Sequence, residues 1–284
     1  MAVNARALFR LVVLALLGGC IAPGEPPRPP SAPVVPDVPD APDVPRVPPP
    51  RTVPPVAPVP STPSVPSVPA SFDLAKKRAL EVYADHRVTL YCGCDFDAER
   101  RIDATSCGYV PRHASRRALR VEWEHMVAAY EFGGHRACWH DTPCVDGHGQ
   151  AFGGRRCCRE RDPEFRRMEA DLMNLSPEVG ELNADRSNFA FGDVEGEPRA
   201  YGACDFEVDR QTDTTELSPD VRGDVARAYL YMHEVYGPEA LPLSPAALER
   251  FEAWHHADPP TAWERLRNER IRAIQGVPNP WLDR

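Results

Sequence analysis

Proline is the residue type that most limits how this chain can fold. About two residues in five are proline from Ile21 to Ala70, and this stretch contains no aromatic residue. Such a segment has too little apolar surface to form a core and favours extended polyproline II. We therefore predict a disordered or polyproline II linker over residues 21–70 and one folded domain over residues 71–284. An SH3-type ligand is the alternative, but the repeats lack a fixed basic PxxP pattern.

The first residues have the pattern of a secretory signal. Arg6 and Arg10 precede an apolar run over residues 11–17, which is too short to span a bilayer as a stable helix. The run ends in Leu-Gly-Gly-Cys, which resembles a bacterial lipobox and makes Cys20 the predicted site of lipidation. An ordinary signal peptide that happens to contain a cysteine is the alternative. Because Ile21 is not the Asp often found after this cysteine in inner-membrane lipoproteins, we expect an exported outer-membrane lipoprotein, facing the periplasm or the cell surface.

Cysteine usage agrees with an oxidising compartment. Beyond Cys20, the folded part contains an even set of cysteines: Cys92, Cys94, Cys107, Cys138, Cys144, Cys157, Cys158 and Cys204. In an exported chain this set predicts four disulfides, although roughly a hundred pairings are possible from the sequence alone. Zinc binding is the competing interpretation, and the Cys-x-Cys and Cys-Cys spacings do not match the usual pair of CxxC knuckles.

The charge distribution is uneven. The formal net charge is -9, which is unusual for a chain that binds phosphates through Lys and Arg. Arginine nevertheless outnumbers Asp plus Glu from Arg100 to Arg167, whereas residues 205–216 are acidic. The pattern is compatible with a basic patch on an acidic body, or simply with a solvated arginine-rich surface.

Apolar spacing predicts a mixed α+β domain in which helices dominate. Helix signals occur over residues 71–86, 181–187, 218–237, 245–256 and 261–274, and mixed helical spacing follows Pro163. Two β-type runs are Val88–Tyr91 and Leu119–Trp123. The Cys-rich segment from Arg136 to Arg161 contains many Gly and no sustained periodicity, and it is predicted to be a long, disulfide-stapled loop or insertion.

Several sequence blocks then occur in a fixed order. They are "YCGCDF", "SCGYVPR", "EWEHMVAAYEFG", "FRRMEADLMNLSPEVGELNADRSNF", "YGACDF" and "RNERIRAIQGVPNPW". This set resembles the bacterial endonuclease I family of periplasmic and secreted nucleases. The resemblance implies a ββα-metal (His-Me finger) core with surrounding α-helices, holding one divalent ion that is typically Mg²⁺, with Mn²⁺ or Ca²⁺ as possible substitutes.

The same resemblance assigns the central residues. Glu124 and Asn183 match the two metal ligands, and hard oxygen ligands suit Mg²⁺, which takes only a few protein groups. His125 matches the general base that activates water, and its other ring nitrogen should be held by a backbone carbonyl near Glu169. Successive side chains of an extended strand point to opposite faces, so Glu124 and His125 can share a site only where the strand ends or bends.

Further residues match the family less directly. Arg155 matches the arginine that contacts the cleaved phosphate, with Arg156 as a close rival beside it. Glu169 matches a carboxylate near the site, although a structural salt bridge explains it equally well. Asn174 and Arg186 are expected to be loop and helix supports.

The resemblance implies hydrolysis of DNA and RNA with little sequence preference, leaving 5′-phosphate ends, by a monomeric domain that contacts the phosphodiester backbone. Two departures from the family pattern are Ala128, where proline is usual, and a Gly/His-rich stretch between Cys138 and Cys158. An inactive nucleic-acid-binding lipoprotein and a structural outer-membrane lipoprotein are the alternatives. A zinc peptidase is disfavoured because the chain contains no His-Glu-x-x-His.

Overall fold

The computed structural model describes residues 65–196 and 198–284. The predicted signal peptide, the lipidation site Cys20 and nearly all of the predicted linker lie outside the described residues. Within the described part, no helix is long and apolar enough to cross a membrane.

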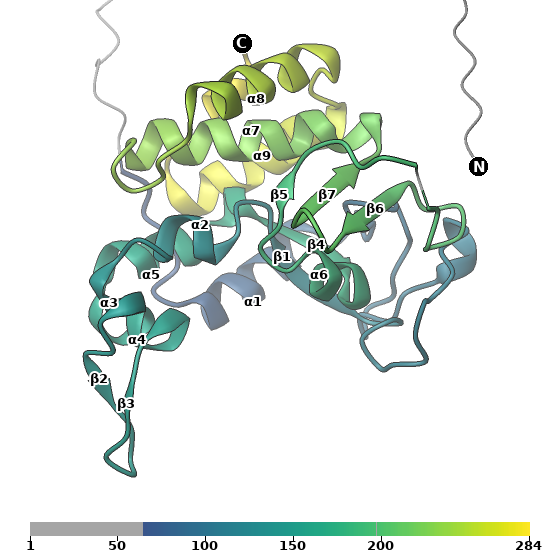
Figure 1. Cartoon of the computed structure of the whole chain (residues 1–284). Helices are drawn as coiled ribbons and strands as arrows, with labels where there is room; N and C mark the ends of the chain where they lie inside the picture. The colour runs from purple at the N-terminus through teal and green to yellow at the C-terminus, as the bar shows by residue number, and fades with distance from the viewer. Residues whose placement is uncertain (1–64, 197) are drawn as a thin grey trace, which may run out of the picture. The chain divides into compact units, whose positions relative to one another are not determined.

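A two-stranded antiparallel sheet and one short helix form the centre of the fold (Figure 1). Strand β1 (Val121–His125) pairs with β4 (Leu175–Val179), and helix α6 (Gly180–Arg186) begins at the residue after β4. A Cβ atom on Gly180 would come within 2.8 Å of the Arg117 carbonyl oxygen, so the glycine allows α6 to start close against the segment that leads into β1.

Helices cover this centre. Helix α1 (Phe72–Val82) is capped by the Ser71 hydroxyl, and its last residue lies before the predicted end at His86. Helices α7 (Pro219–Tyr236), α8 (Pro245–Ala257) and α9 (Ala262–Gln275) lie together in Figure 1, close to their predicted bounds. The short elements η2 (Leu172–Asn174) and η3 (Pro280–Leu282) pack against α7.

A second small sheet and one 3-10 turn complete the body of the domain. Strand β7 (Thr214–Leu217) lies between β5 (Ala190–Phe191), which is parallel to it, and β6 (Phe206–Asp209), which is antiparallel. The turn η1 covers Ala104–Ser106.

A projecting arm replaces the predicted stapled loop over residues 136–161. That prediction was wrong in part, since the segment contains α3 (Ala137–His140), a hairpin of β2 (Cys144–Val145) and β3 (Ala151–Phe152), and α4 (Gly154–Arg161). Figure 1 shows the hairpin extending away from the body. Helix α4 has few apolar residues, and the buried disulfides of Cys157 and Cys158 provide its apolar contacts with the rest of the domain. Helices α2 (Ala129–Gly133) and α5 (Pro163–Glu169) flank the arm.

The predicted strand at Val88–Tyr91 was also wrong. Only Val88 makes a β-bridge there, with Asp95. The backbone N–H of Tyr91 donates instead to the carboxylate of Glu178 at 2.7 Å, so a side chain takes the donor that a neighbouring strand would have used.

The four predicted disulfides are confirmed. The pairs are Cys92–Cys204, Cys94–Cys107, Cys138–Cys158 and Cys144–Cys157.

Candidate active site

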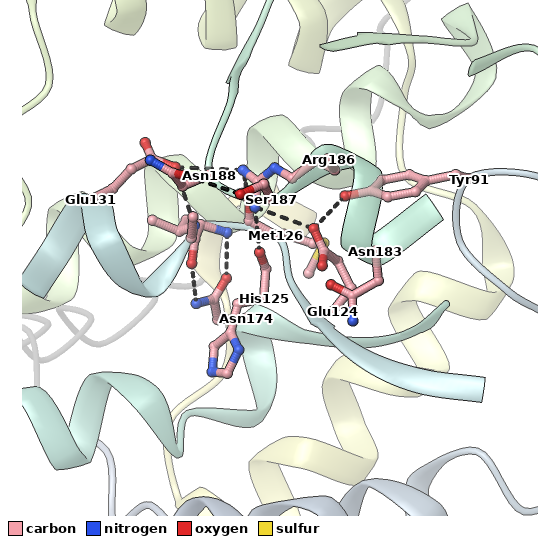
Figure 2. A network of polar contacts seen from close by, with 12 residues as sticks. Tyr91, Glu124, His125, Met126, Glu131, Asn174, Asn183, Arg186, Ser187 and Asn188 are labelled. Carbon is pink, nitrogen blue, oxygen red and sulfur yellow. Dashed lines mark hydrogen bonds and ion pairs between the residues drawn. The ribbon is translucent and has the colours of Figure 1, made fainter. Parts of the chain in front are cut away.

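One cleft brings together four of the predicted site residues. The C-terminal half of β1, the start of α4 and the helix α6 all contribute to its lining, which includes Glu124, His125, Arg155 and Asn183. Figure 2 shows His125 on one side of the β1 end, with Glu124 and Asn183 on the other. His125 is the last residue of β1. The strand therefore ends at the point where Glu124 and His125 can both line one cleft.

His125 is buried, and one of its ring nitrogens bonds a backbone carbonyl. The Nε2 atom lies 2.9 Å from the backbone carbonyl oxygen of Glu169, so Nε2 must carry the proton and donate it. This contact agrees with the carbonyl expected near Glu169. Burial and the nearby charge of Arg155 hold the pKa of His125 well below its usual value. The imidazole is therefore neutral at pH 7, with the lone pair of Nδ1 facing the guanidinium of Arg155.

The geometry separates Arg155 from its rival Arg156. The Nη2 atom of Arg155 lies 3.4 Å from Nδ1 of His125, on the side of the ring where the lone pair is. Arg156 lies over the Phe152 ring and pairs with Glu160, so it faces the arm. Arg155 is thus the arginine that lies next to the proposed base.

The carboxylate of Glu169 is engaged by two arginines. It accepts a hydrogen bond from Nε of Arg155 at 2.5 Å and two from Nε of Arg159 at 2.8 and 2.7 Å, and its side chain is 2% exposed. Of the two interpretations offered by the sequence, this placement favours a salt bridge that holds Arg155 in position.

Phe72 is a site residue that sequence analysis missed. Its ring lies 4.8 Å from the imidazole of His125, measured between centroids, and it lines the same cleft. The guanidinium groups of Arg155 and Arg159 lie over its face. Phe72 therefore packs His125 and the arginines together, although a first-turn phenylalanine gives no sign of this in the sequence.

Glu124 is a buried carboxylate with both of its hydrogen bonds on one oxygen. Its Oε1 atom accepts from the Tyr91 hydroxyl at 2.6 Å and from Nη1 of Arg186 at 3.2 Å. Burial raises the pKa of Glu124, and the charge of Arg186 acts in the opposite direction. Among the described residues, no hydrogen bond to Oε2 accompanies these two, so this oxygen can serve as a ligand.

Asn183 is oriented by a neighbouring carboxylate. Its Nδ2 atom donates to Oε2 of Glu122 at 3.2 Å, and Arg117 and Arg120 in turn bind Glu122. Because the amide nitrogen is used in this way, Oδ1 is the atom left for another partner.

The available oxygens fit a hard divalent cation. Among the described residues, no three His, Cys, Asp or Glu side chains are grouped in a way that would hold a metal ion. The Oε2 atom of Glu124 and Oδ1 of Asn183 are the oxygens left over by the hydrogen bonds above, and such a pair would suit Mg²⁺, an ion that keeps several of its waters.

The support roles expected for Asn174 and Arg186 agree with their contacts. The Asn174 amide bonds both the N–H and the carbonyl of Val127, at 2.7 and 3.0 Å. Arg186 is 1% exposed and also donates to the carbonyl oxygens of His125 and Met126. Both residues thus fix the backbone immediately after β1.

Comparison with known proteins gives a consistent result. The family model for endonuclease I matches residues 72–284. An extracellular deoxyribonuclease of Aeromonas hydrophila is 41% identical over 218 residues, covering 75% of this chain and 89% of the relative. A periplasmic deoxyribonuclease of the same species is 40% identical over 218 residues, covering 75% and 86%. Endonuclease-1 of Buchnera aphidicola subsp. Acyrthosiphon pisum is 34% identical over 215 residues, covering 75% and 80%.

Proposed function

Since the chain belongs to the endonuclease I family and is an endonuclease, we propose that it hydrolyses phosphodiester bonds with a divalent metal ion held by Glu124 and Asn183 and with His125 as general base. The observation that supports this best is the convergence of Glu124, His125, Arg155 and Asn183 on one cleft. The pair β1 and β4 with α6 is proposed to be the ββα-metal core.

The reaction begins with a water molecule beside Nδ1 of His125. The imidazole takes a proton from this water as its oxygen attacks the phosphorus, and the bond to the 3′ oxygen breaks, leaving a 5′-phosphate. The departing 3′ oxygen keeps the bonding electron pair and takes a proton from solvent. Arg155 lies next to Nδ1 and offers a planar guanidinium to the phosphate oxygens. Glu124 and Asn183 would hold the divalent ion, which would supply positive charge to stabilise the negative charge that develops in the reaction.

The proposed substrates are DNA and RNA. The two Aeromonas hydrophila relatives are named deoxyribonucleases, which supports DNA as a substrate. Arginine contacts to the phosphate backbone are shared by all sequences, so we expect little sequence preference. An inactive nucleic-acid binder receives no support from relatives whose names are those of nucleases.

Cleavage of supercoiled plasmid by the oxidised protein tests this function. We expect cleavage with Mg²⁺ and none with EDTA. His125→Ala should lower turnover by roughly 10²-fold to 10⁴-fold, whereas Glu124→Gln and Asn183→Ala should first raise the metal concentration required. The exposed His256 on α8 provides a control, since His256→Ala should cleave like the parent. Cleavage that persists in EDTA, or a fully active His125→Ala variant, would refute the mechanism.

The cellular location has its own test. The relatives named extracellular or periplasmic support export of this chain. We further propose that Cys20 is lipidated and anchors the domain to the outer membrane. Cells fed a labelled fatty acid should label the parent and not Cys20→Ser, and an unlabelled, freely soluble mature protein would exclude the anchor.

A further inference from the structure

We infer that Tyr91 and Arg186 are positioning residues that hold Glu124 so that its Oε2 atom faces the cleft as a single-oxygen ligand for a divalent cation. This inference rests on the proposed role of Glu124. It adds two residues from distant parts of the chain that the proposed reaction does not itself use.

Tyr91 is held rigidly from several directions. Its side chain is 4% exposed and stacks on Phe206, with ring centroids 4.9 Å apart. Its backbone N–H is fixed by Glu178, and the next residue, Cys92, is joined to Cys204. The hydroxyl therefore reaches Oε1 of Glu124 from a fixed point, and its 2.6 Å distance is that of a charge-assisted hydrogen bond.

Arg186 approaches the same oxygen from helix α6. A buried guanidinium is costly unless its donors are paired, and here both terminal nitrogens are paired while Nε is not: Nη1 bonds Oε1 of Glu124 and the His125 carbonyl oxygen. The Nη2 atom bonds the Met126 carbonyl oxygen at 2.9 Å and the Tyr229 hydroxyl at 3.3 Å. Figure 2 shows the guanidinium lying above the end of β1 with Tyr91 on the far side of Glu124.

The two donors have a common consequence. Because both donors bind Oε1, rotation of the carboxylate away from them would break two hydrogen bonds. The second oxygen is therefore the one presented to the cleft. Asn183 and Arg186 are also three residues apart on α6, so they project from the same face of that helix. Helix α6 thus provides one ligand directly and orients the other.

The charges near Arg186 favour a cation in the cleft. The guanidinium faces two carboxylates, Glu124 at 3.2 Å and Glu131 at 3.5 Å. One guanidinium and two carboxylates leave a local charge of about −1, which favours a cation at the cleft oxygen of Glu124. Partners that orient a metal ligand typically change metal affinity by roughly 10-fold to 100-fold when they are removed.

Titration with Mn²⁺, with the free ion measured by electron paramagnetic resonance, tests the inference in the absence of nucleic acid. Tyr91→Phe keeps the ring stacked on Phe206 and removes only the hydroxyl. We expect its Kd for Mn²⁺ to rise by roughly 10-fold, and saturating metal should restore kcat for plasmid cleavage. Tyr231→Phe is the matched control, since it removes a buried hydroxyl that donates to Asp171 at 3.0 Å, away from the cleft. Its Kd should equal that of the parent.

The outcomes separate this inference from the proposed function. If Glu124→Gln binds Mn²⁺ as the parent does, Glu124 is not a ligand and both ideas fail. If Glu124→Gln loses binding while Tyr91→Phe and a folded Arg186→Lys variant retain the parent Kd, only the positioning roles are refuted. An unchanged melting temperature for Tyr91→Phe together with the weaker Kd would support the inference over a general loss of stability.

Discussion

At the scale of single residues, the protonation state of His125 decides whether the cleft can act as a base. Burial and Arg155 both lower its pKa, while the hydrogen bond to the Glu169 carbonyl has the opposite effect. The first two effects prevail, so we predict that the ring stays neutral at pH 6.5 and is protonated only well below that value. Titration of the His125 ring by NMR in EDTA, with the signal assigned by its loss in His125→Gln, provides the measurement.

Arg155→Met gives this prediction a control. Removing the guanidinium takes away the largest charge effect, so the pKa of His125 should move up toward its usual value while burial and the charges of Arg159 and Arg186 continue to lower it. A parent ring that titrates at 6.5 or above, or a pKa that does not respond to Arg155→Met, would contradict the account.

The residues of the site differ in how far the sequence could predict them. Glu124, His125 and Asn183 lie in sequence blocks that carry the family pattern, and the structure brings them to one cleft. Phe72 and the role of Tyr91 could not be predicted, because each contacts the site across a long chain separation, and the block that begins at Tyr91 does not show which residue its hydroxyl binds. Contacts of this kind are set by packing of the whole domain.

At the scale of elements, contacts with distant parts of the chain also explain why the predictions for residues 136–161 and 88–91 failed. The long helices follow from apolar periodicity and capping residues, which are local signals. Helix α4 has no such periodicity, and the cystines that bury its inner face are formed with partners elsewhere on the arm. The segment at residues 88–91 has β-type composition, but its donor at Tyr91 is used by Glu178.

The disulfide Cys144–Cys157 is predicted to support the site through the arm. It joins the hairpin to α4, the helix that carries Arg155. Replacing both cysteines by alanine should reduce the free energy of unfolding by about 3 kcal/mol, a typical value for loops near this length. Cleavage should also weaken, because Arg155 loses its fixed position. Chemical denaturation and plasmid cleavage measure the two effects.

The bridge Cys94–Cys107 offers a comparison of equal loop length, since both pairs are 13 residues apart. Its removal should cost similar stability on chain-entropy grounds. If deleting Cys144–Cys157 leaves cleavage unchanged while the protein stays folded, the arm does not position Arg155.

Asp224 on α7, which lies near Glu264 on α9, is predicted to make the stability of the fold depend on pH. Burial, and next the charge of Glu264, raise the pKa of Asp224 to about 8 from an ordinary value of 3.8. Between these values the folded state binds more protons than the unfolded state, so stability falls as pH rises through that window. Asp224→Asn should flatten the decline. Urea midpoints between pH 4 and pH 9 measure it, with the exposed Asp220→Asn as control.

At the scale of the whole molecule, the net charge of -9 and a nucleic-acid substrate are reconciled by where the cations lie. Basic side chains from α1, the segments on either side of η1, and α4 line one cleft: Lys76, Arg100, Arg117, Arg120 and Arg155. The sequence allowed a basic patch or a solvated arginine surface, and the cleft lining favours the patch. Local attraction of phosphates then does not require a positive total charge.

Because these cations line the cleft, we predict that the cleft residues set how strongly DNA binding depends on salt concentration. Each phosphate contact on a duplex contributes about 0.9 to the slope of log affinity against log salt concentration. The double variant Lys76→Gln/Arg100→Gln should therefore bind duplex DNA more weakly, with a slope shallower by up to about 2. Binding is measured in EDTA so that the DNA stays intact. Arg272→Gln/Arg284→Gln changes the total charge equally outside the cleft and should keep the parent slope. Equal slopes for the two double variants would mean that total charge, and not the cleft, governs binding.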